Sequence, residues 1–229
     1  MKIRKWAFGL LFLCFLSPSR LVIAQTRLEE SWEKEANRRQ PADKVMDIVG
    51  IGPGMIIGEI GAGRGRYTVL IAQRVGDQGK VYANDIDANA LGFLKERCRR
   101  NGIANIETVL GKVDDPLLPR SGLDMIFMVW TYHMMEKPVE MLRSFASYLK
   151  PGATVVMIEP IAGETEDEIK EATARLGRKP SDINVVSEES VKRDAAEAGF
   201  ELVRMDSSLS KDNIFILRPK AVRSHISRP

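Results

Sequence analysis

Short apolar runs alternate with amphipathic stretches along most of the chain. The runs predict strands, and the stretches between them, with apolar residues three or four apart, predict helices. The expected strands are 55–59, 80–85, 105–110, 124–129, 153–158, 200–206 and 213–218. The expected helices are 28–39, 43–49, 67–75, 88–101, 139–149, 166–176 and 187–198. Because strands alternate with helices, the pattern predicts an α/β fold with a Rossmann-like, doubly wound sheet and helices on both faces, closed by a hairpin of the last two strands.

A glycine-spaced turn separates the first expected strand from the helix after it. The turn carries Gly61, Gly63 and Gly65 and follows an acid, Glu59. Glycine tolerates positive φ and lets a ligand approach bare backbone at a helix start, where N–H groups are unpaired. The next strand ends at Asp85, where a neighbouring parallel strand would present a carboxylate to a ribose. The two stretches together predict a nucleoside-binding crevice.

The spacing of the glycines separates two classes of nucleoside. A dinucleotide fingerprint needs its third glycine three places after the second, but Arg66 stands there. An acid, one spacer and Gly-x-Gly-x-Gly instead resembles the first motif of class I S-adenosylmethionine-dependent methyltransferases, in particular small bacterial ones, over about residues 38–218. The resemblance implies S-adenosylmethionine as cofactor, methyl transfer to a small or medium acceptor, and a seven-stranded, mostly parallel sheet with an antiparallel last strand.

The resemblance also implies which residues contact the cofactor. Glu59 is expected to hold the methionine end through its amino group, and Asp85 to hold the ribose. Where such enzymes usually have an acid near the adenine, this chain has Lys112, so Asp114 is the expected substitute. Ile86, Val113 and Trp130 are expected as walls of the pocket. The full expected set is Glu59, Gly61, Ala62, Gly63, Gly65, Asp85, Ile86, Val113, Asp114 and Trp130.

Two residues just past the fourth strand are candidates for chemistry on the acceptor. Tyr132 and His133 follow that strand at the edge where open α/β sheets bind their ligands. Either could act as a general base for a weakly acidic acceptor. For His133 the sequence favours a hydrogen-bonded histidine at a helix start over a base, and Tyr132 is equally plausible as a wall of the pocket. Tyr67 is a further candidate, for a cation–π contact with the sulfonium.

The first two dozen residues have the pattern of a secretory signal. Lys2, Arg4 and Lys5 precede an apolar run over 6–16, and Ala24 provides a small residue for cleavage. Cleavage there would change the formal charge from +3 to −1, because residues 1–24 contain four basic residues and no acid. The expected organisation is a signal peptide at 1–24, one methyltransferase domain at 25–220 and a flexible basic tail at 221–229. The expected location is periplasmic or secreted, and a cytoplasmic or N-terminally tethered protein is the alternative.

The remaining composition restricts the partners and the competing functions. The chain without its signal has no basic stripe of the kind that nucleic-acid binding shows, and no stable membrane span is expected in it. Two distant histidines and the single remaining cysteine, Cys98, do not form a zinc cluster, so no metal is expected. No cluster of aromatic residues and no row of basic residues in the sequence identifies the acceptor. A non-catalytic S-adenosylmethionine- or nucleotide-binding protein, favoured by Lys112, and an NAD-dependent oxidoreductase stay as alternatives.

Overall fold

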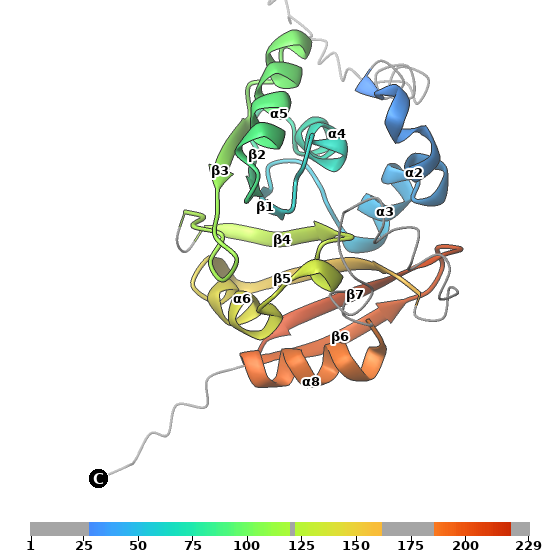
Figure 1. Cartoon of the computed structure of the whole chain (residues 1–229), viewed down its shortest axis with the longest axis vertical. Helices are drawn as coiled ribbons and strands as arrows, with labels where there is room; N and C mark the ends of the chain where they lie inside the picture. The colour runs from blue at the N-terminus through green and yellow to red at the C-terminus, as the bar shows by residue number, and fades with distance from the viewer. Residues whose placement is uncertain (1–27, 120–121, 162–185, 221–229) are drawn as a thin grey trace, which may run out of the picture.

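The computed structural model describes residues 28–119, 122–161 and 186–220 (Figure 1). The predicted signal peptide, the predicted helix 166–176 and the predicted basic tail lie outside the described residues. Within the described ranges, no helix is long and apolar enough to cross a membrane.

A seven-stranded sheet forms the centre of the fold. Its strands are β1 (Ile56–Ile60), β2 (Lys80–Asp85), β3 (Ile106–Leu110), β4 (Leu123–Val129), β5 (Leu149–Pro160), β6 (Phe200–Asp206) and β7 (Asp212–Pro219). Their order is β3-β2-β1-β4-β5-β7-β6. Strands β1 to β5 pair in parallel, and β7 runs antiparallel between β5 and β6. The predicted sheet is therefore confirmed, and its strand order reverses between β1 and β4, where α/β sheets of this kind bind ligands.

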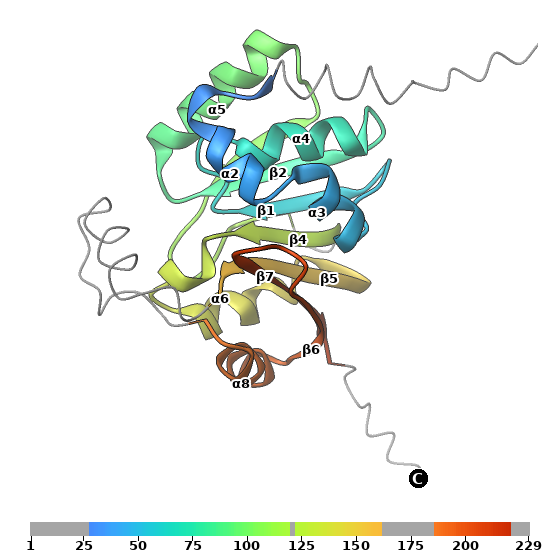
Figure 2. The same cartoon turned by 90° about the vertical axis from the view of Figure 1, so that its right-hand side faces the viewer.

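Helices cover both faces of the sheet, as the alternating pattern predicts (Figures 1 and 2). On one face α3 (Ala42–Val49), α4 (Arg66–Val75) and α5 (Ala88–Asn101) pack on β1, β2 and β4 through residues such as Val69 and Ile71. On the other, α6 (Pro138–Phe145) and α8 (Glu188–Ala198) pack through Phe145 and Val191. The central strands are buried from both sides, which explains their nearly continuous apolar sequence.

One predicted helix boundary is wrong. The helix expected over 139–149 ends at Phe145, and Leu149 already belongs to β5, where it pairs with Leu123. Phe145, Tyr148 and Leu149 keep helical spacing and are all buried. Tyr148 reaches the core from a turn and Leu149 from the start of β5, so burial produces the same apolar pattern without a helix.

The N-terminal segment differs in detail from the single helix expected over 28–39. It contains a short 3-10 helix, η1 (Ser31–Glu33), followed by α2 (Lys34–Arg39). Trp32, the one aromatic residue of this segment, is 49% exposed. Glu33 is buried instead and pairs with Arg97 of α5, with nitrogen–oxygen distances of 2.6 and 2.8 Å. Breaking a buried pair of this kind costs about 3–5 kcal/mol, so it holds the segment against the domain.

Candidate functional site

The loop between β1 and α4 needs its glycines for two different reasons. Gly61, Gly63 and Gly65 all have positive φ, at +70°, +54° and +86°. A Cβ on Gly61 would lie 2.3 Å from Thr131 Oγ1, and a Cβ on Gly65 would lie 2.3 Å from Leu94 Cδ1. A Cβ on Gly63 would have no neighbour within 4 Å. Packing therefore excludes side chains at the first and third positions, whereas Gly63 borders open space that a ligand can occupy.

Asp85 joins the glycine loop to the end of β2. Its Oδ2 accepts a hydrogen bond from the Gly63 N–H at 2.7 Å, and its Oδ1 accepts one from the Asp87 N–H at 2.9 Å. Beside it, the Ala62 N–H donates to the Asn84 carbonyl at 2.9 Å. The carboxylate thus lies against the backbone of the predicted cofactor loop. Asp87 is the N-cap of α5 and accepts from the Asn89 N–H.

Glu59 lies beneath the loop at the end of β1. The residue is 4% exposed, and its Oε2 accepts a hydrogen bond from the Thr68 hydroxyl at 2.5 Å. Burial raises the pKa of the Glu59 carboxyl to about 8. A nearby cation, such as an ammonium group, would lower this pKa again and stabilise the ionised form.

Two exposed apolar side chains lie beyond the ends of β2 and β3. Ile86 is 57% exposed and Val113 is 39% exposed. The strands they follow are neighbours, with Asp85 opposite Leu110. Exposed aliphatic groups at this edge suit the faces of a flat heterocycle. Asp114 is half-buried and its Oδ2 lies 3.4 Å from the Lys137 ammonium, so it has a cationic partner at the crevice edge. Lys112 is exposed.

Trp130 follows β4 on the opposite side of the glycine loop. Its backbone has a positive φ of +51°, and its indole N–H donates to Asp212 Oδ1 at 2.7 Å. The guanidinium groups of Arg39 and Arg66 lie 5.1 and 5.2 Å from its ring centre. These contacts bring α2, the start of α4 and β7 together around the indole ring. Sequence analysis named Trp130 but missed Arg39, Arg66 and Asp212.

His133 is oriented by a buried carboxylate that sequence analysis missed. It lies in the short 3-10 helix η2 (Tyr132–Met134), and its Nδ1 is 2.5 Å from Glu159 Oε2 at the end of β5. Glu159 is 0% exposed, and its Oε1 accepts from the N–H groups of Thr131 and Tyr132 at 3.0 and 2.8 Å. The carboxylate accepts a hydrogen bond from the Nδ1–H group. In a neutral imidazole the lone pair is therefore on Nε2. The sequence does contain a pattern that could have identified Glu159, because this acid follows an apolar run just as Glu59 and Asp85 do.

Tyr132 does not lie with His133 in the crevice. It is 2% exposed, packs in the core with residues of α6 and α8, and donates its hydroxyl proton to Asp194 Oδ2 at 2.5 Å. Burial, followed by the hydrogen bond to Asp194, raises the pKa of Tyr132. This placement removes Tyr132 from the candidate bases. Tyr67 is also 2% exposed and its ring packs 5.1 Å from Phe127, so a contact with a sulfonium is not supported.

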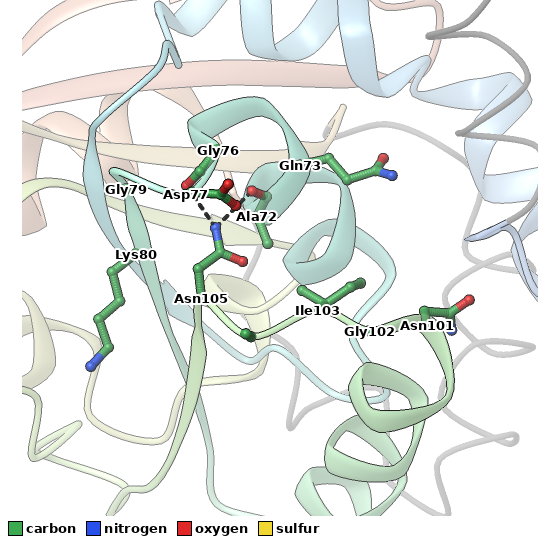
Figure 3. Close-up of a pocket in the computed structure, with 11 residues that line it drawn as sticks. Ala72, Gln73, Gly76, Asp77, Gly79, Lys80, Asn101, Gly102, Ile103 and Asn105 are labelled. Carbon is green, nitrogen blue, oxygen red and sulfur yellow. Dashed lines mark hydrogen bonds between the residues drawn. The ribbon is translucent and has the colours of Figure 1, made fainter.

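A hollow of about 680 Å³ lies at the other edge of the sheet (Figure 3). It is lined by the last turns of α4 and α5 and by the amino ends of β2 and β3. Asn105 Nδ2 donates to the carbonyls of Ala72 and Gly76 there, at 2.9 Å each. The hollow shares no residue with the crevice at the carboxyl ends of the strands. In the described part of the chain, no three His, Cys, Asp or Glu residues are grouped so that they could hold a metal ion.

Part of the chain is similar to known methyltransferases. The family model described as "Methyltransferase domain" matches residues 57–152. The ubiquinone/menaquinone biosynthesis C-methyltransferase UbiE of Vibrio parahaemolyticus is 30% identical over 115 residues, which are 50% of this chain and 44% of that protein. The enzyme of the same name from Escherichia fergusonii is 28% identical over 115 residues, 50% of this chain and 46% of that protein. The chain thus spans less than half the length of these curated relatives.

Solved structures share the fold. A SAM-dependent methyltransferase from Aquifex aeolicus aligns with a TM-score of 0.70 at 24% identity, covering 87% of this chain and 97% of that chain. Geranyl diphosphate C-methyltransferase from Streptomyces coelicolor, solved with S-adenosyl-L-homocysteine, aligns with a TM-score of 0.63 at 14% identity, covering 77% and 78%. At these identities the matches establish the architecture alone.

Proposed function

Because the chain belongs to the class I S-adenosylmethionine-dependent methyltransferases, we propose that it transfers the cofactor's methyl group to a small or medium-sized acceptor. The observation that carries the proposal is the glycine loop at the switch point of the sheet, where Gly63 borders open space and its N–H is held by Asp85. The cofactor supplies a methyl group already activated on a sulfonium. The protein then contributes chiefly alignment of the reacting groups.

Three features of the crevice support this cofactor. Asp85 offers a carboxylate beside the loop, suited to the two hydroxyls of a ribose. Ile86 and Val113 offer exposed aliphatic groups for the adenine faces. Burial raises the pKa of the Glu59 carboxyl to about 8, so a cation beside it, such as the cofactor's amino group, would stabilise its ionised form. No comparable feature favours NAD.

His133 is the proposed general base of the site. With Nδ1 bonded to buried Glu159, His133 can take up a proton at Nε2, and the carboxylate stabilises the imidazolium that forms. The His133 side chain is 15% exposed, so it is not sealed in the core as Tyr132 is. A base is needed when a hydroxyl or a carbon is methylated, because each loses a proton. The relatives named as C-methyltransferases agree with an acceptor of this kind.

Binding of S-adenosylhomocysteine is expected to raise the thermal midpoint of the protein. A ligand selective for the native state stabilises it by about 2.7 kcal/mol at a hundredfold excess over Kd, or about 5–10 °C for a chain of this size. Differential scanning fluorimetry with S-adenosylhomocysteine, and with NAD in parallel, measures the shift. No shift at millimolar S-adenosylhomocysteine would contradict the proposed function, and a shift with NAD alone would support an oxidoreductase.

Replacing Asp85 by alanine is expected to weaken S-adenosylhomocysteine binding about ten- to a hundredfold. Hydrogen bonds to a charged acceptor contribute about 1.5–3 kcal/mol, and the variant also frees the Gly63 N–H. Asp87→Ala is the matched control, because it removes a neighbouring carboxylate that caps α5. Isothermal titration calorimetry compares the two variants. Equal dissociation constants for wild type and Asp85→Ala would show that the ribose is held elsewhere.

Export of the chain is a second proposal. It is supported by the order of the basic start, the apolar run and Ala24 in the sequence.

A further inference from the structure

Arg66, the first residue of α4, is a buried cation. The residue is 9% exposed, and its guanidinium stacks 4.5 Å from the ring centre of Tyr67 and 5.2 Å from that of Trp130. It donates to the amide oxygens of Gln40 and, at 3.4 Å, of Asn37. No carboxylate of the described residues lies within ion-pair distance of it. Burial accordingly lowers the pKa of the Arg66 guanidinium. Burying a charge without a counter-ion destabilises the folded protein, so an anion bound at this site would be stabilising.

Two unsatisfied donors lie beside Arg66. Gln40, at the end of α2, is 0% exposed, and its Oε1 accepts from Arg66 while its Nε2 has no hydrogen-bond partner. The hydroxyl of Tyr67, under the same guanidinium, is buried as well and has no acceptor for its proton. Buried polar groups are normally paired, and unpaired ones require an explanation. Two donors without an acceptor and a cation without a counter-ion, grouped in one place, are explained by a ligand that is an anion and only accepts hydrogen bonds.

The acids around this cluster do not supply the missing acceptor. Asp212 is occupied by Arg39 and by the Trp130 indole, and Glu33 is occupied by Arg97. Glu59 accepts the Thr68 hydroxyl proton at its Oε2, and burial raises the pKa of its carboxyl, which disfavours the ionised form. The cluster therefore stays cationic. It also adjoins the start of a ten-residue helix, directly after the glycine loop, where backbone N–H groups favour an anion.

We propose that Arg66, Gln40 and Tyr67 form a carboxylate-binding pocket that holds the α-carboxylate of S-adenosylmethionine. The proposal rests on the proposed function. The cofactor's amino and carboxylate groups are bonded to one carbon, so the site for the cation and the site for the anion must adjoin. Glu59 and Arg66 fulfil this, since they lie at the two ends of the same loop and interact electrostatically. Gln40 then links the N-terminal segment to the bound cofactor.

The test compares two ligands that differ only in the carboxylate. S-adenosylhomocysteine and its decarboxylated analogue, 5′-S-(3-aminopropyl)-5′-thioadenosine, are titrated calorimetrically into wild type and Arg66→Gln. Wild type is expected to bind S-adenosylhomocysteine about ten- to a hundredfold more tightly than the analogue. In Arg66→Gln this preference is expected to fall to threefold or less, because only the carboxylate-bearing ligand loses affinity.

Arg64→Gln is the matched control. It removes the same charge from the same loop, but Arg64 is exposed and its guanidinium lies on the Phe93 ring, so the preference is expected to stay at the wild-type value. Thermal midpoints without ligand verify folding, and Arg66→Lys, which keeps the charge, replaces Arg66→Gln if that variant does not fold. Partial retention of the preference is expected for the lysine variant.

Three results would overturn the proposal. One is equal affinity of wild type for both ligands. Another is an equal loss for both ligands in Arg66→Gln, which would assign Arg66 to the acceptor or to the fold alone. Both leave the proposed function standing, because S-adenosylhomocysteine still binds. Absence of any binding of S-adenosylhomocysteine to wild type would overturn the proposed function together with this inference.

Discussion

Replacing Gly63 by valine is expected to abolish S-adenosylhomocysteine binding while the fold is retained. Gly63 has a φ of +54°, which a β-branched residue adopts only with strain of about 1–2 kcal/mol. The new side chain would meet no protein atom at its Cβ, so the fold can accommodate it. The same open space is the one the ligand needs. We expect affinity to fall at least about a thousandfold, or about 4 kcal/mol, as measured by calorimetry.

Gly102→Val separates the effect of strain from the effect of lost space. Gly102 ends α5 with a φ of +65°, and a Cβ there also has no neighbour within 4 Å. It lies at the opposite edge of the sheet, so this variant is expected to lose similar stability and keep its ligand affinity. If Gly63→Val bound S-adenosylhomocysteine within about tenfold of wild type, the cofactor would not lie over the glycine loop.

Replacing His133 by alanine is expected to lower turnover about 10²- to 10⁴-fold and to leave S-adenosylhomocysteine affinity within about threefold. This is the range for a positioned general base that does not hold the cofactor. The expectation applies to hydroxyl and carbon acceptors, and thiol acceptors are expected to be much less affected. A panel of phenols, carbon acids and thiols, scored by S-adenosylhomocysteine formed, measures it.

Glu159→Gln tests whether Glu159 acts through His133. The carboxylate holds Nδ1 and so orients the imidazole, and its replacement is expected to lower turnover with hydroxyl and carbon acceptors while thiol acceptors are much less affected. A purely structural role would lower turnover with all acceptors alike. Tyr132→Phe is the control, because it removes a hydroxyl bonded to Asp194 in the core and is expected to cost stability but little turnover. Full turnover of His133→Ala with hydroxyl and carbon acceptors would contradict the assignment.

The fold and the part of the crevice around the glycine loop could be predicted from the sequence, because both depend on short stretches of chain. Alternation of apolar runs and amphipathic stretches predicts the seven strands and the helices on both faces. The glycine loop and Asp85 could be predicted because parallel strands all end at one edge, so residues that follow two runs meet there.

The rest of the crevice could not be predicted from the sequence. It depends on which distant residues come into contact and on which face of an element each side chain lies. His133 and Glu159 are brought together by the pairing of β4 with β5. Tyr132 precedes His133 in the sequence, yet its side chain is buried in the core with residues of α6 and α8. Arg66 was visible only as a residue where a dinucleotide fingerprint has glycine. Its burial beside Gln40, without a counter-ion, exists because α2 packs over the start of α4, a long-range contact that no local pattern encodes.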